Sequence, residues 1–134
     1  IRGTRLEPVQ PTSLADNPPA ITPAGRVHAS LADWARFVRA HVGGPGAVRL
    51  VSEATLKRLH TPLPGADYAL GWIAVERDWG GGRVLTHAGS NTMNYALAWA
   101  APARRFAVLV VTNAGGGDED AWCDEAAGTL IRRF

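Results

Sequence analysis

The first regular pattern of apolar positions is helical and runs from residue 30 to residue 44. Apolar side chains recur there every three or four residues, which is the spacing of one helix face. Ser30 starts the pattern, Asp33 follows three residues later, and Gly43 ends it, as expected for a capped helix. The face predicted to be buried carries Leu31, Trp34, Ala35, Val38 and Val42.

Two later stretches also have helical spacing. In residues 51–62, Ser52 is the expected N-cap, Leu56 and Leu59 point inward, and a proline ends the helix. A last helix should follow Asp118 as its N-cap and lie against a sheet. Its apolar residues form two neighbouring stripes, one of Trp122, Ala126 and Leu130 and one of Cys123, Ala127 and Ile131.

Between these helices the period changes to that of β-strands. Residues 68–89 contain two strand-like runs separated by the glycines 80–82, which predicts a hairpin. Residues 94–113 predict a second hairpin, turned at residues 102–105. Its strands are apolar at almost every position, so we expect them to be buried on both faces.

The order of elements is therefore loop, helix, helix, four strands, helix. This order predicts an α+β fold, an antiparallel sheet flanked by helices. Residues 1–25 contain five prolines and neither apolar period, so we expect an extended connection there and a folded unit over residues 26–134.

Composition narrows the class of protein. The 134 residues are 46% hydrophobic and carry a net charge of +2, which is the profile of a globular domain. The arginines alternate with acidic residues, which argues against a nucleic-acid partner. No apolar run reaches the roughly 18 residues of a membrane span. No charged and then apolar leader precedes Ile1, so we do not expect a signal peptide in this chain. The single cysteine excludes an internal disulfide, and with four scattered histidines it predicts neither a metal site nor a cofactor.

Candidate chemistry lies where the second predicted strand breaks into the sequence His-Ala-Gly-Ser-Asn-Thr. A glycine inside a strand weakens it unless a bulge or a close ligand requires it, and Gly89 stands there. The next backbone N–H, that of Ser90, could stabilise an oxyanion, with the imidazole of His87 at the same rim. Asn91 and Thr92 add polar groups that could bind a substrate.

Two other interpretations of this stretch remain open at this point. Residues 89–92 could form only a turn, because glycine, serine, asparagine and threonine all favour turns. A Ser-His-Asp triad could also be assembled, although no Gly-x-Ser-x-Gly sequence supports it. Its members would be Ser90, His87 or His28, and Asp118 or Asp33.

Five segments in order resemble the C-terminal half of the serine β-lactamase and penicillin-binding protein superfamily. They are PAGRVHASLADWARFV, LVSEATLKRLHTP, YALGW, THAGSNTMNYALAWAAPARRFAVLVVTN and the closing helix, together spanning residues 23–134. The chain is most similar to the class C-like branch, which includes esterases and D-aminopeptidases. The resemblance implies the C-terminal portion of a β-lactamase-like fold.

Members of that superfamily use a serine in Ser-x-x-Lys, a Tyr-x-Asn or Ser-x-Asn motif, and a Lys-Thr-Gly motif. Only the third has a counterpart here, in His87-Ala88-Gly89, with histidine in place of lysine as in many esterases and peptidases. The resemblance implies that the Ser90 N–H is one of two oxyanion donors. The second donor would belong to the nucleophile.

The other two motifs are missing. Lys57 is the only lysine and has Ala54 three residues before it, and neither Tyr68 nor Tyr95 is followed by Asn two positions later. The resemblance thus implies a fragment of a serine hydrolase that cleaves an amide, peptide or ester through an acyl-enzyme and is inactive alone. Its partner would be the missing N-terminal part of the same protein, or a second copy covering an exposed face. The alternative is a degenerate, non-catalytic binding module.

The remaining histidine, tryptophan and cysteine side chains are most simply structural. His28, His41 and His60 are expected at the surface or as helix caps, where protonation of the last two would be favourable. Cys123 is expected as a small buried hydrophobe. Trp79 is expected to be exposed, and the tryptophans expected in the core are Trp34, Trp72, Trp99 and Trp122.

Overall fold

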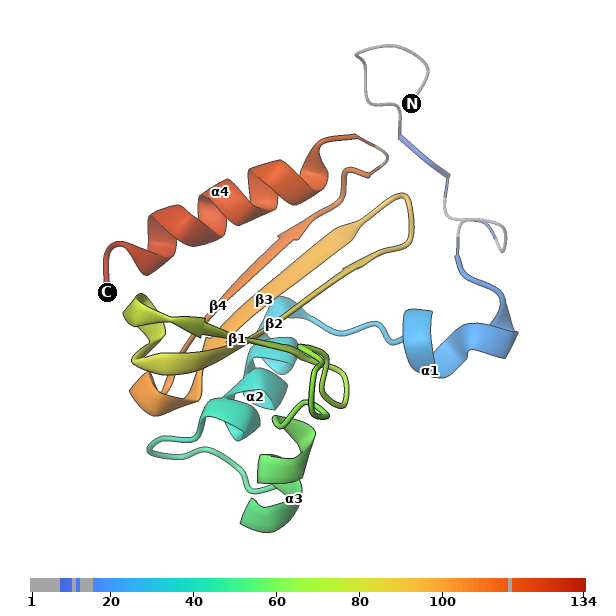
Figure 1. Ribbon diagram of the computed structural model, residues 1–134. Coiled ribbons are helices and arrows are strands. Elements are labelled where there is room, and N and C mark those ends of the chain that lie inside the picture. The colour runs from blue at the N-terminus through green and yellow to red at the C-terminus, as the bar shows by residue number, and fades with distance from the viewer. Residues whose placement is uncertain (1–7, 11, 13–15, 116) are drawn as a thin grey trace.

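A four-stranded antiparallel sheet forms the centre of the computed structural model, which describes residues 8–10, 12, 16–115 and 117–134 (Figure 1). Each strand pairs with the next along the chain, in the order β1-β2-β3-β4. Short 3-10 turns at Asp78–Gly80 and Pro102–Arg104 close the two hairpins, which confirms both predicted turns. The strands are β1 (Ile73–Arg77), β2 (Gly82–Ser90), β3 (Tyr95–Ala101) and β4 (Phe106–Thr112).

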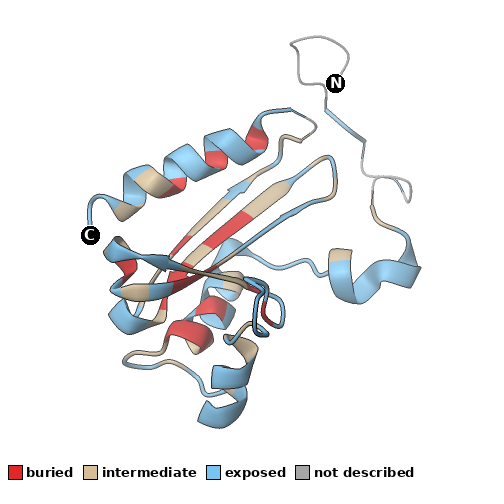
Figure 2. Cartoon of the chain, in the orientation of Figure 1, coloured by how far each residue is buried: buried red, intermediate tan, exposed pale blue. Residues whose placement is uncertain are grey.

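Helices α2 (Leu31–Val42) and α4 (Glu119–Ile131) cover opposite faces of this sheet (Figure 1). Side chains alternate between the two faces along each strand, so neighbouring residues enter different cores. The core under α2 contains Val38, Val42, Trp72, Leu85, Ala98 and Ala100. The core under α4 contains Leu97, Val108, Cys123 and Ala127. The predicted α+β fold is confirmed, and β3 is buried or half-buried along its whole length (Figure 2). The expected burial of β4 is wrong in part, because β4 is an edge strand in which only Val108 is buried and Val111 is exposed.

The predicted caps of the first two long helices are also present. The Ser30 hydroxyl accepts a hydrogen bond from the Asp33 N–H, and Gly43 ends α2 with a φ of 75°. The Ser52 hydroxyl accepts one from the Thr55 N–H at the start of α3 (Glu53–Leu59). Such caps satisfy N–H groups that have no partner within the helix.

The segment predicted to be an extended connection is partly helical. A 3-10 turn (Pro19–Ile21) leads into the short helix α1 (Thr22–Gly25). Each turn has a proline in its first positions, where the missing N–H has no helical partner to lose. The side-chain amide of Asn17 donates to the Gly25 carbonyl and closes this segment.

Helix α4 faces the sheet with only one of its two predicted stripes. Cys123 and Ala127 are buried, whereas Trp122 is 52% exposed, so its expected place in the core is wrong. Small side chains let the helix approach the strands closely, and a tryptophan would hold it away. Burial raises the pKa of the Cys123 thiol, in keeping with the expected buried hydrophobe.

Three further side chains differ from the predicted burial. Leu31 and Ala35 lie on the predicted face of α2 but are exposed, because no described element covers that end of the helix. Trp79 is half-buried instead of exposed, and its ring stands edge-on to Trp99 and Phe106. Within the described ranges, no helix has the length and apolar character needed to cross a membrane.

Candidate active-site edge

The outer edge of β2 is open over its last four residues. Strand β1 starts at Ile73, which is paired with Thr86, so residues 87–90 extend beyond it. Gly71 has a φ of 87°, a conformation that favours glycine, and it turns the chain away from β2 just before β1. Among the residues that the structure describes, β2 therefore pairs only with β3 from His87 to Ser90.

The ladder between β2 and β3 sets the direction of each backbone group on this edge. The Asn91 N–H donates to the Asn94 carbonyl at 3.3 Å, which makes these two residues a hydrogen-bonded pair. Such pairs alternate with non-hydrogen-bonded ones in an antiparallel ladder. Ser90, opposite Tyr95, is therefore in a non-hydrogen-bonded pair, and its N–H points to the open edge.

The side chains of His87 and Ser90 point to opposite faces of the sheet. Leu85 belongs to the core under α2, so His87 and Gly89 share that face, and Ser90 has the other. The Ser90 hydroxyl accepts the Thr92 N–H at 3.0 Å. A triad of Ser90 with His87 is therefore wrong, because residues three apart on a strand cannot meet.

The other predicted members of that triad lie in structural contacts. Asp33 bonds to Ser30 and Arg36 on α2, and these contacts lower the pKa of its carboxyl. His28 is exposed, as expected, with its ring nitrogen 4.0 Å from Asp16. Asp118 precedes α4, where its side chain makes no capping bond.

A tight turn connects the open edge to β3. The Asn91 side-chain oxygen accepts the N–H groups of Met93, at 3.2 Å, and Asn94, at 2.8 Å. Thr92 is exposed and has a φ of 69°, which is uncommon for a β-branched residue. The acceptor oxygen of Asn91 is thus used by the turn, and the Thr92 side chain faces outward.

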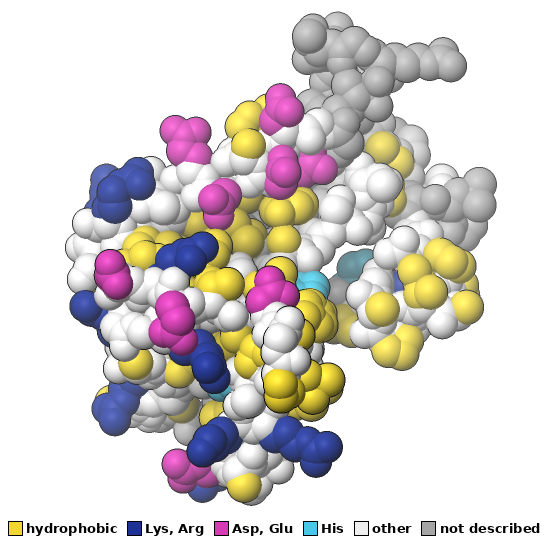
Figure 3. Space-filling view, in the orientation of Figure 1, with side chains coloured by type: hydrophobic (Ala, Val, Ile, Leu, Met, Phe, Trp, Pro, Cys, Tyr) yellow, Lys and Arg dark blue, Asp and Glu magenta, His cyan; other side chains and the backbone are white. Residues whose placement is uncertain are grey.

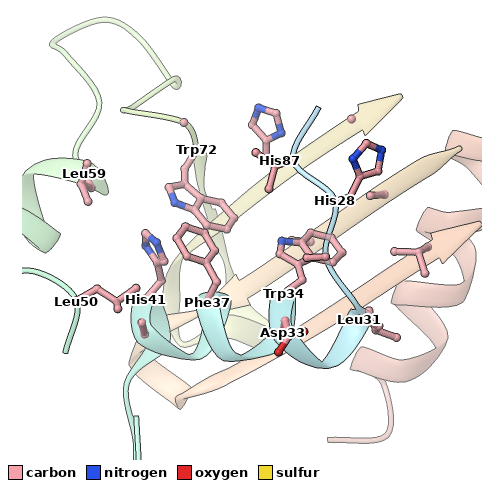
Figure 4. A pocket seen from close by; sticks show the side chains of 18 of the residues that line it. His28, Leu31, Asp33, Trp34, Phe37, His41, Leu50, Leu59, Trp72 and His87 are labelled. Carbon is pink, nitrogen blue, oxygen red and sulfur yellow. The ribbon is translucent and has the colours of Figure 1, made fainter. Parts of the chain in front are cut away.

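A large cavity adjoins the open edge on the α2 side. Its volume is about 1670 Å³, and Figure 3 shows a hollow between the body of the molecule and the α1 segment, with histidines at its rim. Trp34, Phe37 and Trp72 line its floor, and His87 stands above them on β2 (Figure 4). The exposed apolar side chains among its walls are Val27, Leu31, Phe37, Val48, Leu50, Val51, Leu70 and Val111.

Gly89 lies at this cavity, and the fold does not require a glycine there. A Cβ added to it would meet no heavy atom of the described residues within 4 Å. Its φ is not in the left-handed region, so any residue could adopt this backbone. The space over Gly89 is open to a ligand lying along β2.

Two contacts near the cavity were not predicted from the sequence. The Tyr68 hydroxyl lies 3.2 Å from Nε2 of His87, and Nδ1 of His41 lies 2.9 Å from Nε2 of His60. The expected surface position of His41 is wrong, because it is 8% exposed and its ring stands edge-on to Phe37 and Trp72. Each pair joins residues 19 positions apart, so no local pattern could reveal it.

Protonation of the His41–His60 pair is unfavourable, contrary to the expectation of charged caps. Burial lowers the pKa of His41, and burial together with the neighbouring His41 lowers the pKa of His60 to about 4. The unfolded chain binds these protons below about pH 6.5, whereas the folded chain does not. The contribution of this neutral pair to the free energy of unfolding is therefore complete above pH 6.5 and is lost as the pH falls toward 4.

We expect the free energy of unfolding to be about 1–2 kcal/mol lower at pH 4.5 than at pH 7, less than full linkage because the His60 ring is only half-buried. Urea unfolding at a series of pH values measures it. The variant His60→Gln keeps a hydrogen-bonding side chain that does not titrate, so the pH dependence between 6.5 and 4.5 should become shallower and keep only the part due to His41. Equal slopes for the two proteins would contradict this origin.

The fold and the open strand edge define an α+β domain with a candidate site at the end of β2. A family model described as Beta-lactamase matches residues 2–129, so the chain belongs to the β-lactamase family, as the resemblance implied. A search of curated proteins and of solved structures finds no match to the chain. Within the described residues, no group of three or more His, Cys, Asp or Glu side chains could hold a metal ion.

Proposed function

We propose that this chain supplies one wall of the active site of a serine hydrolase that cleaves an amide, peptide or ester through an acyl-enzyme. The nucleophile, in a Ser-x-x-Lys motif, lies outside residues 1–134, because Lys57 is the only lysine here and Ala54 precedes it by three. Ser90 donates its N–H to the oxyanion, and Gly89 allows the substrate to approach. His87 orients the substrate carbonyl or the proton relay, and Asn91, which lines the cavity, contacts the substrate. The expected substrate contact of Thr92 is not part of the proposal, because its exposed side chain is not among the residues that line the cavity.

The observation that carries this proposal is the open edge of β2 beside a glycine that the fold does not need. A free N–H is effective when it lies about 2.7–3.1 Å from the developing oxyanion. The Ser90 N–H points to that edge, and the space over Gly89 is empty. A substrate backbone lying along β2 would bring its carbonyl to this donor.

Two uncovered surfaces support the proposal that residues 26–134 are the C-terminal part of a larger domain, reached through the connection at 1–25. The cavity walls expose many large apolar side chains, more than a closed monomer usually leaves in one place. Strand β4 is an edge strand of seven residues without charge or proline, FAVLVVT, and natural edges are seldom left unprotected in this way. The N-terminal part of the same protein would cover both surfaces, and a second copy is the alternative.

Intact-mass analysis after incubation with a fluorophosphonate, and separately with a penicillin, tests the proposed activity. The 134-residue chain should remain unmodified, whereas the longer reading frame should gain one adduct on a serine of Ser-x-x-Lys. In that longer protein, Gly89→Ala should slow labelling at least about tenfold, because the added methyl group stands where the substrate approaches. An adduct on the short chain, or none on the longer protein, would contradict the proposal.

A non-catalytic binding module is the second candidate, and the absence of Ser-x-x-Lys from these residues favours it. Such a module should be closed and monomeric. Solution scattering distinguishes the two, since a hydrolase portion with an uncovered apolar face should self-associate as its concentration rises.

A further inference from the structure

The only side chain bonded to His87 in the described structure comes from Tyr68, outside the predicted site. The Tyr68 hydroxyl lies 3.2 Å from Nε2 of His87. The two rings are 6.2 Å apart between centroids and inclined by 64°, so they meet edge to face. The contact therefore restrains both the position and the tilt of the imidazole.

The backbone around Tyr68 is held on both sides, which makes it a rigid support. Tyr68 forms an isolated β-bridge with Ile73. The Ala69 N–H donates to the Trp72 carbonyl at 2.7 Å, and the Ala74 N–H donates to the Asp67 carbonyl at 2.8 Å. Ala69 and Trp72 are both buried and anchor this turn in the core.

His87, by contrast, has little other support. It is exposed on the part of β2 that extends beyond β1. The space over Gly89, two residues further along the same face of β2, is also unfilled by described residues. An exposed neutral imidazole rotates and exchanges its proton between Nδ1 and Nε2. A hydrogen bond to one nitrogen selects one of these tautomers.

We infer that Tyr68 is a positioning residue that holds His87 in the tautomer with its proton on Nδ1. A phenol is a better donor than an imidazole N–H, so the Tyr68 O–H donates to Nε2 and leaves the Nδ1–H free to donate. The free Nδ1–H then suits a carbonyl oxygen of an ester or amide. The use of that donor rests on the proposed function, whereas the tautomer itself does not.

The test is the nitrogen spectrum of His87 in the uniformly ¹⁵N-labelled 134-residue chain near pH 7.5. Nδ1 should have the shift of a protonated nitrogen and Nε2 that of a bare one, with His87→Gln assigning the signals. In Tyr68→Phe the two shifts should move toward each other as both tautomers become populated. Tyr95→Phe is the matched control, because Tyr95 is the only other tyrosine, and it should leave the His87 shifts unchanged.

Unchanged His87 shifts in Tyr68→Phe would overturn the inference, as would two averaged shifts in the unsubstituted chain. If Tyr68→Phe does not fold, the test uses the unsubstituted chain alone. The Tyr68 hydroxyl proton is then expected to be protected from exchange with water and close to the His87 ring. A freely exchanging hydroxyl proton would contradict the inference. These measurements need no catalysis. A longer protein that is never acylated would therefore refute the proposed function and leave the role of Tyr68 standing.

Discussion

Truncation of Leu85 to alanine is expected to lower the free energy of unfolding by about 3 kcal/mol. Leu85 is fully buried in the core under α2, where it packs in the same cluster as Val38 and Trp72. Removing its branched end loses the transfer free energy of those carbons and leaves a cavity that the surrounding strands fill only in part. Urea unfolding followed by tryptophan fluorescence measures the change.

Leu63→Ala is the matched control, because it removes the same atoms from a side chain that is 77% exposed. Its effect should stay within about 0.5 kcal/mol. Equal losses at Leu63 and Leu85 would mean that the core under α2 is not closed in the way described. A loss at Leu85 alone would confirm that its side chain is packed in the core under α2.

The second large effect is expected at Gly115, which lies against the turn that follows the open edge. A Cβ at Gly115 would stand 2.4 Å from the carbonyl oxygen of Thr92 and 2.6 Å from its carbonyl carbon. These are backbone atoms that cannot rotate aside, so the turn itself must move. Gly115→Ala should cost about 2 kcal/mol of stability and shift the amide signals of residues 90–94.

Gly89→Ala serves as the control, since the same methyl group enters empty space there. This variant should be as stable as the unsubstituted chain, or more stable by about 0.5 kcal/mol, because alanine has less conformational freedom to lose on folding. A comparable loss at both glycines would contradict the close approach of residue 115 to the turn. The pair separates a glycine required by packing from one left open for a ligand.

Most of the secondary structure could be predicted because its signals are local. Ser30 and Gly43 delimit α2 through hydrogen bonds and dihedral angles that involve only their neighbours. The hairpin turns follow in the same way from glycines and from the proline of residues 102–105. The predicted site residues His87, Gly89 and Ser90 lie within one run of four positions, so their place on one strand end needed only the strand itself to be identified.

The contacts between distant segments could not be predicted. Tyr68 reaches His87 because Gly71 turns the chain back before β1, and His60 reaches His41 because α3 folds toward α2. Neither path is encoded in the periodicity of one element. Both pairs depend on how segments far apart in the sequence are packed against each other.

The prediction of which face of α4 is buried was wrong in part for a different reason. Its sequence offers two adjacent apolar stripes, and a period of 3.6 residues does not decide between them. The distance at which the helix packs on β3 and β4 decides, and the stripe with Cys123 and Ala127 permits the closer approach. Trp122 is then left on the outer side, half exposed.

The strand order has a consequence for how the chain folds. Because every strand pairs with the one next to it in sequence, the sheet needs no long loop to close before its first contacts form. Proteins dominated by such short-range pairings fold faster than those with distant ones. We expect the two hairpins to join first, with α2 and α4, which come from opposite ends of the sequence, docking later onto a sheet already in register.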